Sequence, residues 1–133
     1  MNEKYLISTR GFKNIIENGQ TTGFQLNVRI TYYRGVPLSC IDGYDIVVDG
    51  ESFSSDKIRY FVNGRTYTTA EAAEETKARF QFYAPLTIFV SKPGGLTPGV
   101  HDVQVVEKLR ISYHKDEMNP SIAAARKKLA LVI

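Results

Sequence analysis

Hydrophobic and polar residues alternate along several stretches of this chain. The longest such stretch is residues 23–33, GFQLNVRITYY, in which every second residue from Phe24 to Tyr32 is apolar. A period of two places these side chains on one face of a β-strand, so we predict a strand with one buried face. Three further stretches, LTIFVSK (86–92), HDVQVVEKLRISYH (101–114) and KKLALVI (127–133), predict strands in the same way. The inward residues predicted for the last two are Val103, Val105, Leu109, Ile111, Tyr113, Leu129, Leu131 and Ile133.

Turn-forming dipeptides separate these stretches. Asn18-Gly19, Asp49-Gly50 and Asn63-Gly64 readily adopt the positive φ angles of type I′ turns, so each predicts a two-residue hairpin. Turn signals about every ten residues, between about eight to ten short strands, predict an antiparallel sandwich or barrel. The pattern Leu-x-Pro-Gly-x-His-x-Val-x-Val in residues 96–105 is typical of the entry into a late sandwich strand. We therefore expect one all-β domain over 1–133, an antiparallel β-sandwich of immunoglobulin-like or jelly-roll-like type.

Only one helix is predicted. Thr68 and Glu71 have the spacing of a capping box, and the run from Ala70 to Ala78 is rich in helix-forming residues. This helix should be short and peripheral. Residues 114–126, HKDEMNPSIAAAR, are predicted to form a long excursion between the last two strands, because Asn119-Pro120 interrupts regular structure.

Composition describes an ordinary globular chain. The 133 residues suit one domain, and the net charge of +3 comes from scattered basic residues, which argues against a nucleic-acid-binding face. The run Arg126-Lys127-Lys128 is expected to be a solvated strand end rather than a phosphate site. The N-terminus has no apolar signal-peptide core, and no apolar run approaches the roughly 20 residues that span a bilayer. These features favour a cytoplasmic protein that is independent of membranes.

Residues for catalysis or metal binding are few. The two histidines, His101 and His114, would lie about 43 Å apart on a continuous strand, so two strand-end histidines are favoured over a shared site. Cys40 is the only cysteine, which excludes an intramolecular disulfide, and a small buried side chain is favoured over a nucleophile. We therefore predict no catalytic residue, no metal ligand and no cofactor in this chain.

Glu107 occupies an otherwise apolar position of its strand, between Val105 and Leu109. It is either a buried acid with a perturbed pKa or a residue that a β-bulge turns outward. A salt bridge to Arg29 or Arg110, or a bulge, is favoured over a catalytic role.

Two segments are candidate contact surfaces for a partner. In Tyr32-Tyr33-Arg34-Gly35, one tyrosine must face away from the core beside an arginine, and both residue types are enriched at contact hot spots. The alternative is that Tyr33 packs under a neighbouring loop. The same argument applies with less force to Tyr44, Tyr60 and Tyr83.

The second candidate surface is Lys92-Pro93-Gly94-Gly95. In the following residues Pro98 and Gly99 turn the corner into the strand, which is usual for a sandwich. The four residues 92–95 make the loop longer and stiffer than a hairpin needs. We therefore predict that they lie at or near a partner interface.

The order and spacing of these pieces resemble a known family. The segments ENGQTTGFQLNVRITYYRGVPLSCIDGYDIVVDGE (17–51), KPGGLTPGVHDVQV (92–105) and LRISY (109–113) are together similar to the small β subunit of bacterial C-glycoside deglycosidases. The resemblance covers roughly 12–113. The helix candidate in 69–84 and the tail after Tyr113 resemble the family less closely.

The resemblance implies a heteromeric enzyme with a separate catalytic subunit. Its α subunit would be a TIM barrel similar to sugar-phosphate isomerases, with a bound divalent metal, expected to be manganese. The substrate would be a 3-oxo-C-glycoside of a polyphenol, cleaved by carbon–carbon elimination as a lyase reaction. This chain would be an accessory subunit that is inactive alone. The alternative that remains open is a stand-alone carbohydrate-binding or structural β-sandwich module.

Overall fold

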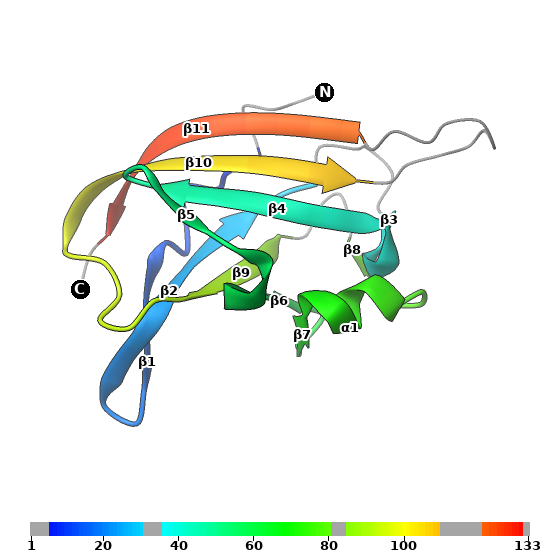
Figure 1. The fold of residues 1–133 in the computed structure, drawn as a ribbon, viewed down its shortest axis with the longest axis horizontal. Coiled ribbons are helices and arrows are strands. Elements are labelled where there is room, and N and C mark those ends of the chain that lie inside the picture. Colours follow the sequence, from blue (N-terminus) through cyan, green and yellow to red (C-terminus); the bar gives the residue numbers. More distant parts are fainter. Residues whose placement is uncertain (1–5, 31–35, 81–84, 110–120, 132–133) are drawn as a thin grey trace.

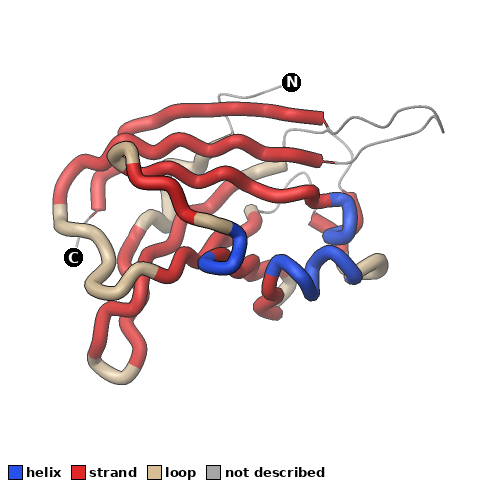
Figure 2. The backbone as a smooth tube through the Cα atoms, viewed as in Figure 1, coloured by secondary structure: helices blue, strands red, loops and turns tan. Residues whose placement is uncertain are grey.

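The computed structural model describes residues 6–30, 36–80, 85–109 and 121–131, which form eleven strands and one α-helix, α1 (Thr69–Glu74) (Figures 1 and 2). Two short 3-10 helices, η2 (Leu38–Cys40) and η3 (Ser55–Lys57), complete these elements. The strands are β1 (Lys13–Glu17), β2 (Gln20–Val28), β3 (Val36–Pro37), β4 (Ile41–Val48), β5 (Glu51–Phe53), β6 (Ile58–Val62), β7 (Arg65–Thr68), β8 (Arg79–Phe80), β9 (Leu86–Ser91), β10 (Gly99–Leu109) and β11 (Ser121–Leu131).

The strands form two main sheets with antiparallel pairing throughout. One sheet has the order β1-β2-β9-β6-β7, and the other has the order β11-β10-β4-β5, whose first three strands lie side by side in Figure 1. The two-residue strands β3 and β8 pair separately. The predicted all-β sandwich is confirmed. The described strands exceed the predicted number partly because β3 and β8 are too short to show an alternating pattern.

All three predicted hairpins are confirmed. Asn18-Gly19 joins β1 to β2, Asp49-Gly50 joins β4 to β5, and Asn63-Gly64 joins β6 to β7. Both residues of each pair have positive φ, with 52°, 51° and 54° at the first residue. These are the backbone angles of type I′ turns, whose twist matches that of the flanking strands.

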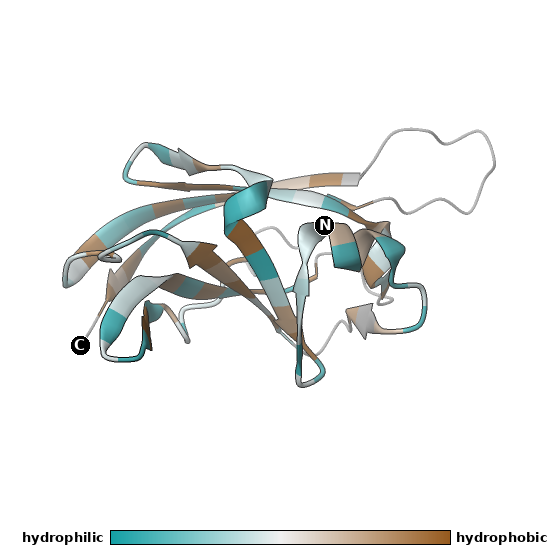
Figure 3. Cartoon of the chain, turned by 60° about the horizontal axis from the view of Figure 1, so that its bottom comes forward, coloured by the Kyte–Doolittle hydropathy of each residue, from teal (hydrophilic) through white to brown (hydrophobic). Residues whose placement is uncertain are grey.

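The core lies between the inner faces of the two main sheets. The rings of Phe24 in β2 and Phe53 in β5 pack edge to face with centroids 5.3 Å apart, so residues of opposite sheets interdigitate. The predicted inward residues Phe24, Leu26 and Val28 of β2 and Ile30 after it are buried, whereas Tyr32 lies outside the described residues. Figure 3 shows hydrophobic and hydrophilic residues alternating along the strands. Full burial of one such phenylalanine contributes about 1.5–3 kcal/mol.

Helix α1 begins as the sequence predicts and ends earlier. The amide of Glu71 donates to Thr68 Oγ1 (3.1 Å) and the amide of Thr68 donates to Glu71 Oε1 (2.9 Å), which is a complete capping box. The helix ends at Glu74 rather than Ala78. The carbonyls of Glu75 and Ala78 instead accept hydrogen bonds from the amides of η2, which draws this segment away from helical geometry.

The last strand begins earlier than predicted. Residues 121–126 were expected to belong to an excursion, but β11 starts at Ser121 and pairs with β10 over its whole length, up to Leu131 opposite Gly99. The early start of β11 follows from the length of β10, because every residue from Ser121 to Leu131 has a pairing partner on β10. Leu129 and Leu131 are buried as predicted, whereas Ile111, Tyr113 and Ile133 lie outside the described residues.

The basic run 126–128 lies within β11, not at its end. Arg126 pairs through two hydrogen bonds with Asp102 on β10, and Lys127 Nζ donates to the carbonyl of Ile7 (3.2 Å). Two of the three cations therefore hydrogen-bond other segments of the same chain.

Candidate functional site

Several predicted contact residues fall outside the part of the chain that the structure describes. They are Tyr32, Tyr33, Arg34, Gly35 and Tyr83. Arg110 and His114 also lie outside it. The predictions for these residues stay predictions, and the candidate site described below is built on the loop that begins at Lys92.

Tyr44 and Tyr60 are not exposed contact residues, so that prediction is wrong. Their strand positions place them on the inner faces of β4 and β6, where they are 5% and 2% exposed, with ring centroids 5.8 Å apart. The Tyr44 hydroxyl donates to Oε2 of Glu107 (2.6 Å). Burial and the neighbouring Glu107 carboxylate raise the pKa of Tyr44, which keeps its hydroxyl protonated.

Glu107 is a fully buried acid that faces inward. The register irregularity of this strand falls between Lys108 and Leu109, one position after Glu107, so it does not turn the side chain outward. Arg29, one expected partner, is exposed. The carboxylate accepts the hydrogen bond of Tyr44, from the neighbouring strand, and the predicted pairing with Arg110 stays a prediction.

The loop of residues 92–98, called here the crossover loop, carries the chain from β9 in one sheet to β10 in the other. Its first residues continue the pairing with β2. The amides of Lys92 and Gly94 donate to the carbonyls of Thr22 and Thr21 (3.0 Å each), and the amide of Gly95 donates to the carbonyl of Lys92 (2.8 Å). The backbone of the loop is therefore held from its first residue.

Asn14 fixes the middle of the crossover loop. Its side-chain amide donates to the carbonyl of Leu96 (2.8 Å), and its Oδ1 accepts from the amide of Leu96 (2.9 Å). One side chain of β1 thus satisfies both backbone groups of a loop residue 82 positions later. Partly buried backbone groups need such partners, because leaving them unpaired is costly.

The glycine pair has a packing function that the sequence did not reveal. Gly95 has φ of 62°, and a Cβ atom there would lie 2.5 Å from Oδ1 of Asn14 and 2.6 Å from Cγ2 of Thr21. Gly94 has φ of 83°, with open space around its Cβ position. The fold therefore requires Gly95, whereas Pro93 and Gly94 are exposed. The prediction that residues 92–95 lie at or near a partner interface stays a prediction.

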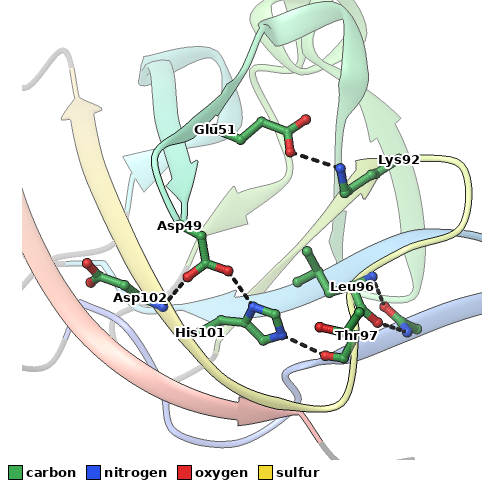
Figure 4. Close-up of polar contacts among 8 residues, drawn as sticks. Asp49, Glu51, Lys92, Leu96, Thr97, His101 and Asp102 are labelled. Atoms are coloured by element: carbon green, nitrogen blue, oxygen red, sulfur yellow. Dashed lines mark hydrogen bonds and ion pairs between the residues drawn. The ribbon is translucent and has the colours of Figure 1, made fainter.

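Lys92 is also tied to this chain. Its Nζ lies 2.9 Å from Oε1 of Glu51 in β5 (Figure 4). The same Nζ lies 5.8 Å from the centroid of the Phe53 ring. The pair is partly exposed, and such pairs contribute at most about 1 kcal/mol. Its effect is to hold the start of the loop against the β4–β5 hairpin.

His101 holds the end of the crossover loop, as Figure 4 shows. Its ring is 6% exposed and packs edge to face on Phe12. Nδ1 donates to Oδ2 of Asp49 and Nε2 donates to the carbonyl of Thr97, each at 2.6 Å. Both partners accept hydrogen bonds, so both ring nitrogens must carry protons, and the imidazolium is the form that satisfies this geometry.

The pKa values of this pair agree with a charged His101. Burial lowers the pKa of His101, but the hydrogen bonds to Asp49 and Thr97 and the charge of Asp49 outweigh it, so the pKa is raised above 6.5. The pKa of Asp49 is lowered, first by the hydrogen bond from the amide of Asp102 (2.9 Å) and then by His101. Asp49 thus joins the β4–β5 turn to the start of β10 while it orients the imidazolium.

His101 was predicted as a strand-end histidine, and it is the third residue of β10. The sequence did not reveal that His101 hydrogen-bonds both Asp49 and Thr97, or that Asn14 hydrogen-bonds the backbone of Leu96. Asp49 lies 52 positions before His101, and Asn14 lies 82 positions before Leu96, so no local spacing in the sequence indicated these contacts. The only signal in the sequence was the Pro-Gly-x-His pattern, which predicted the turn into β10 but not the residues that His101 contacts.

Within the described ranges, no group of three or more histidine, cysteine or acidic side chains is placed to hold a metal ion. Cys40, expected to be buried, is half-buried and packs against the core at the end of η2. In the same part of the chain, no helix has the length and apolar character needed to cross a bilayer.

Comparison with known proteins identifies the family. A family model described as the C-glycoside deglycosidase beta subunit matches residues 2–113. The chain belongs to the C-glycoside deglycosidase beta subunit family. The chain is 41% identical, over 103 residues, to the C-glycoside deglycosidase beta subunit of Eubacterium cellulosolvens, an alignment that covers 77% of this chain and 70% of that protein.

Two further relatives extend the family comparison. The C-glycoside deglycosidase beta subunit of Arthrobacter globiformis is 35% identical over 91 residues, which cover 66% of this chain and 67% of the relative. The 3'-dehydrocarminate deglycosidase beta subunit of a Microbacterium species is 32% identical over 93 residues, 69% of each chain. The crossover loop, Asn14, Asp49 and His101 all lie within the family match, whereas β11 follows it.

Proposed function

We propose that this chain is the small, non-catalytic β subunit of a heteromeric C-glycoside deglycosidase. The observation that carries the proposal is the family match over residues 2–113, together with 41% identity to a relative named as such a subunit. A beta subunit requires a partner, so the activity belongs to an assembly and not to this chain alone.

The partner we propose is a TIM-barrel α subunit similar to sugar-phosphate isomerases. A C-glycoside has no leaving oxygen to protonate, so hydrolysis by two carboxylates is closed to it. A 3-oxo group on the sugar acidifies the proton at C2, which allows a base to remove that proton and the aglycone to leave from C1 as a carbon acid. A divalent metal on the α subunit, expected to be manganese, would stabilise the negative charge that develops on the sugar oxygens.

The role proposed for this chain is to stabilise the α subunit and to shape or cover its barrel mouth. The candidate contact surfaces are residues 32–35 and the exposed residues of the crossover loop, which are Pro93, Gly94, Thr97 and Pro98. The loop is tied to β1, β2, β5 and β10 of its own chain by the contacts described above. Such a loop loses little conformational freedom on binding, which favours a contact function.

Co-expression tests the proposal. The full chain alone should cleave no 3-oxo-C-glycoside, and co-expression with the proposed TIM-barrel α subunit should give a stable, active complex. The matched control is the barrel subunit expressed alone, which should be less soluble or less active. A chain that remains monomeric beside that partner would contradict the proposal and favour a stand-alone carbohydrate-binding or structural module.

A further inference from the structure

A pocket lies between β4, β6 and helix α1. It encloses about 460 Å³ and is formed by β4, the β5–η3 segment, β6 and α1, with Lys108 of β10 at its rim. This volume lies within the range of about 300–1,000 Å³ that is usual for small-molecule sites. The pocket therefore lies where elements of both sheets and the helix meet.

Two tyrosines line the pocket, and they differ in the hydrogen bonding of their hydroxyl groups. The Tyr44 hydroxyl is committed to Glu107 at 2.6 Å. The Tyr60 side chain is also buried, but no hydrogen bond joins its hydroxyl to any residue in the described part of the chain. No buried, unpaired side-chain oxygen or nitrogen remains among the described residues, so the Tyr60 hydroxyl must reach the open space of the pocket.

The Tyr60 hydroxyl is available as a donor. Burial raises the pKa of Tyr60 well above the usual value of 10.0, so its hydroxyl is protonated at neutral pH. A buried hydroxyl without a protein partner loses hydrogen-bond energy unless water or a ligand supplies the partner. The ring of Tyr60 and the neighbouring Phe53 add apolar surface to the pocket.

The rim of the pocket carries charge of both signs. Asp45 and Lys108 form an ion pair of 2.9 Å, and Asp42 is a further carboxylate among the lining residues. Carboxylates accept hydrogen bonds from hydroxyl groups and repel anions, so the rim suits a neutral ligand with hydroxyl donors. Aromatic surface below such a rim suits a ring.

We propose that this pocket binds a neutral ring compound that carries hydroxyl groups, with the Tyr60 hydroxyl as its central hydrogen-bond partner. A sugar and a phenol share this chemistry. The inference goes beyond the proposed function, because it assigns to this chain a binding site of its own that requires no partner subunit.

Titration of the full 133-residue chain with two probes tests the proposal. Methyl glucoside represents the sugar and phenol represents the aromatic ring, each added to about 50 mM because so small a site gives millimolar affinity. We expect saturable shifts of the backbone amide NMR signals of β4, η3 and α1 with one or both probes. The probe that binds identifies the ring type.

Two variants locate the site. Tyr60→Phe removes only the hydroxyl and should weaken binding about 2- to 10-fold, the effect of one hydrogen bond. Tyr67→Phe is the matched control, because Tyr67 lies opposite Tyr60 on β7, is equally buried and does not line the pocket, so it should leave binding unchanged. Ala73→Leu, at an exposed helix residue on the pocket wall, should abolish binding and leave the fold intact.

The proposal is overturned if neither probe gives saturable shifts, if Ala73→Leu leaves binding unchanged, or if Tyr60→Phe and Tyr67→Phe weaken it equally. If Tyr60→Phe fails to fold, Ala73→Leu still tests the proposal, because it should abolish binding of the probe if the probe occupies this pocket. Assembly with the barrel partner, measured on the same variants, should be unaffected. The pocket and the subunit role can therefore fail separately.

Discussion

Nδ1 of His101, at the start of β10, lies 2.6 Å from Oδ2 of Asp49, in the turn between β4 and β5. The same imidazole reaches the carbonyl of Thr97 through Nε2. One side chain thus connects a hairpin, a strand and the crossover loop. Because both partners accept hydrogen bonds, loss of one proton must break one of the two contacts, and the neutral carbonyl of Thr97 is the weaker partner.

The first prediction concerns pH. The pKa of His101 is raised in the folded chain, so its stabilising contribution is complete below about pH 6.5 and is lost as the pH rises through the raised value. Asp49 has a lowered pKa, and its contribution is present above about pH 3.8 and is lost as the pH falls through the lowered value. Urea unfolding should show stability falling above neutral pH, with faster amide exchange in the crossover loop.

Two histidine variants show whether His101 is the source of this pH dependence. His101→Gln should flatten the pH dependence of the unfolding free energy between about pH 6 and pH 9. His114→Gln is the control and should keep the wild-type profile. Equal profiles for the wild type and His101→Gln would show that His101 does not carry the effect.

The second prediction concerns Asn14. Asn14→Ala removes both hydrogen bonds to Leu96 and leaves two partly buried backbone groups without partners, which should cost about 1–3 kcal/mol of unfolding free energy. Denaturant unfolding measures the loss, and amide exchange at Leu96 should accelerate. Gln20→Ala, at an exposed residue of the same hairpin, should cost much less. Similar costs for the two variants would mean that the Asn14 contacts add nothing.

The third prediction separates the two glycines of the crossover loop. Gly94→Ala should cost about 1–2 kcal/mol, because the positive φ alone opposes a side chain there. Gly95→Ala should cost clearly more, because its Cβ also meets Asn14 and Thr21 below 3 Å. Thermal or urea unfolding of the two variants gives the comparison. The close approach at Gly95 would be unimportant if both variants lost the same stability.

The fourth prediction concerns assembly with the proposed α subunit. Thr97→Arg places a long charged side chain on the exposed crossover loop, and Tyr33→Ala removes a candidate anchor. Each should weaken the complex by about tenfold or more if it lies within the contact. Affinity is measured by calorimetry on the purified subunits, with unfolding measured in parallel.

Thr66→Arg is the matched control for assembly. Thr66 is an exposed threonine on β7, an edge strand of the five-stranded sheet. Its substitution should leave the affinity for the α subunit unchanged. A complex that tolerates Thr97→Arg as well as Thr66→Arg would exclude the crossover loop from the interface. If Thr97→Arg lowered the stability of the chain but not its affinity for the α subunit, the loop would likewise lie outside the contact.

The elements that the sequence predicted correctly depend on neighbouring residues. Asn18-Gly19 and its two counterparts determine their turns through their own φ preferences, and Thr68 with Glu71 caps a helix within one turn. The alternation of residues 24–30 identified a buried face because a strand exposes only two sides. These features need no knowledge of the rest of the chain.

The candidate site was predictable only in outline. The segment 92–95 was identified as a loop of unusual stiffness, but its glycines were assigned to a partner, whereas Gly95 is required by Asn14 and Thr21. Tyr60 was taken for an exposed residue because a single strand does not reveal which sheet covers it. Its burial, and the pocket beside it, depend on β4 and α1.

The sequence by itself determined the strand pattern, the hairpins, the helix cap and the family of this protein, because turn chemistry, hydrophobic period and motif order are written in consecutive residues. The tertiary structure decided which polar side chains work together. His101 with Asp49, Asn14 with Leu96 and Tyr44 with Glu107 are joined across 52 to 82 positions of the chain. Such contacts arise only when strands and loops that are distant in the sequence become neighbours in the fold, as β4 and β10 do within one sheet. Each contact is held by the packing of many residues that no local pattern records.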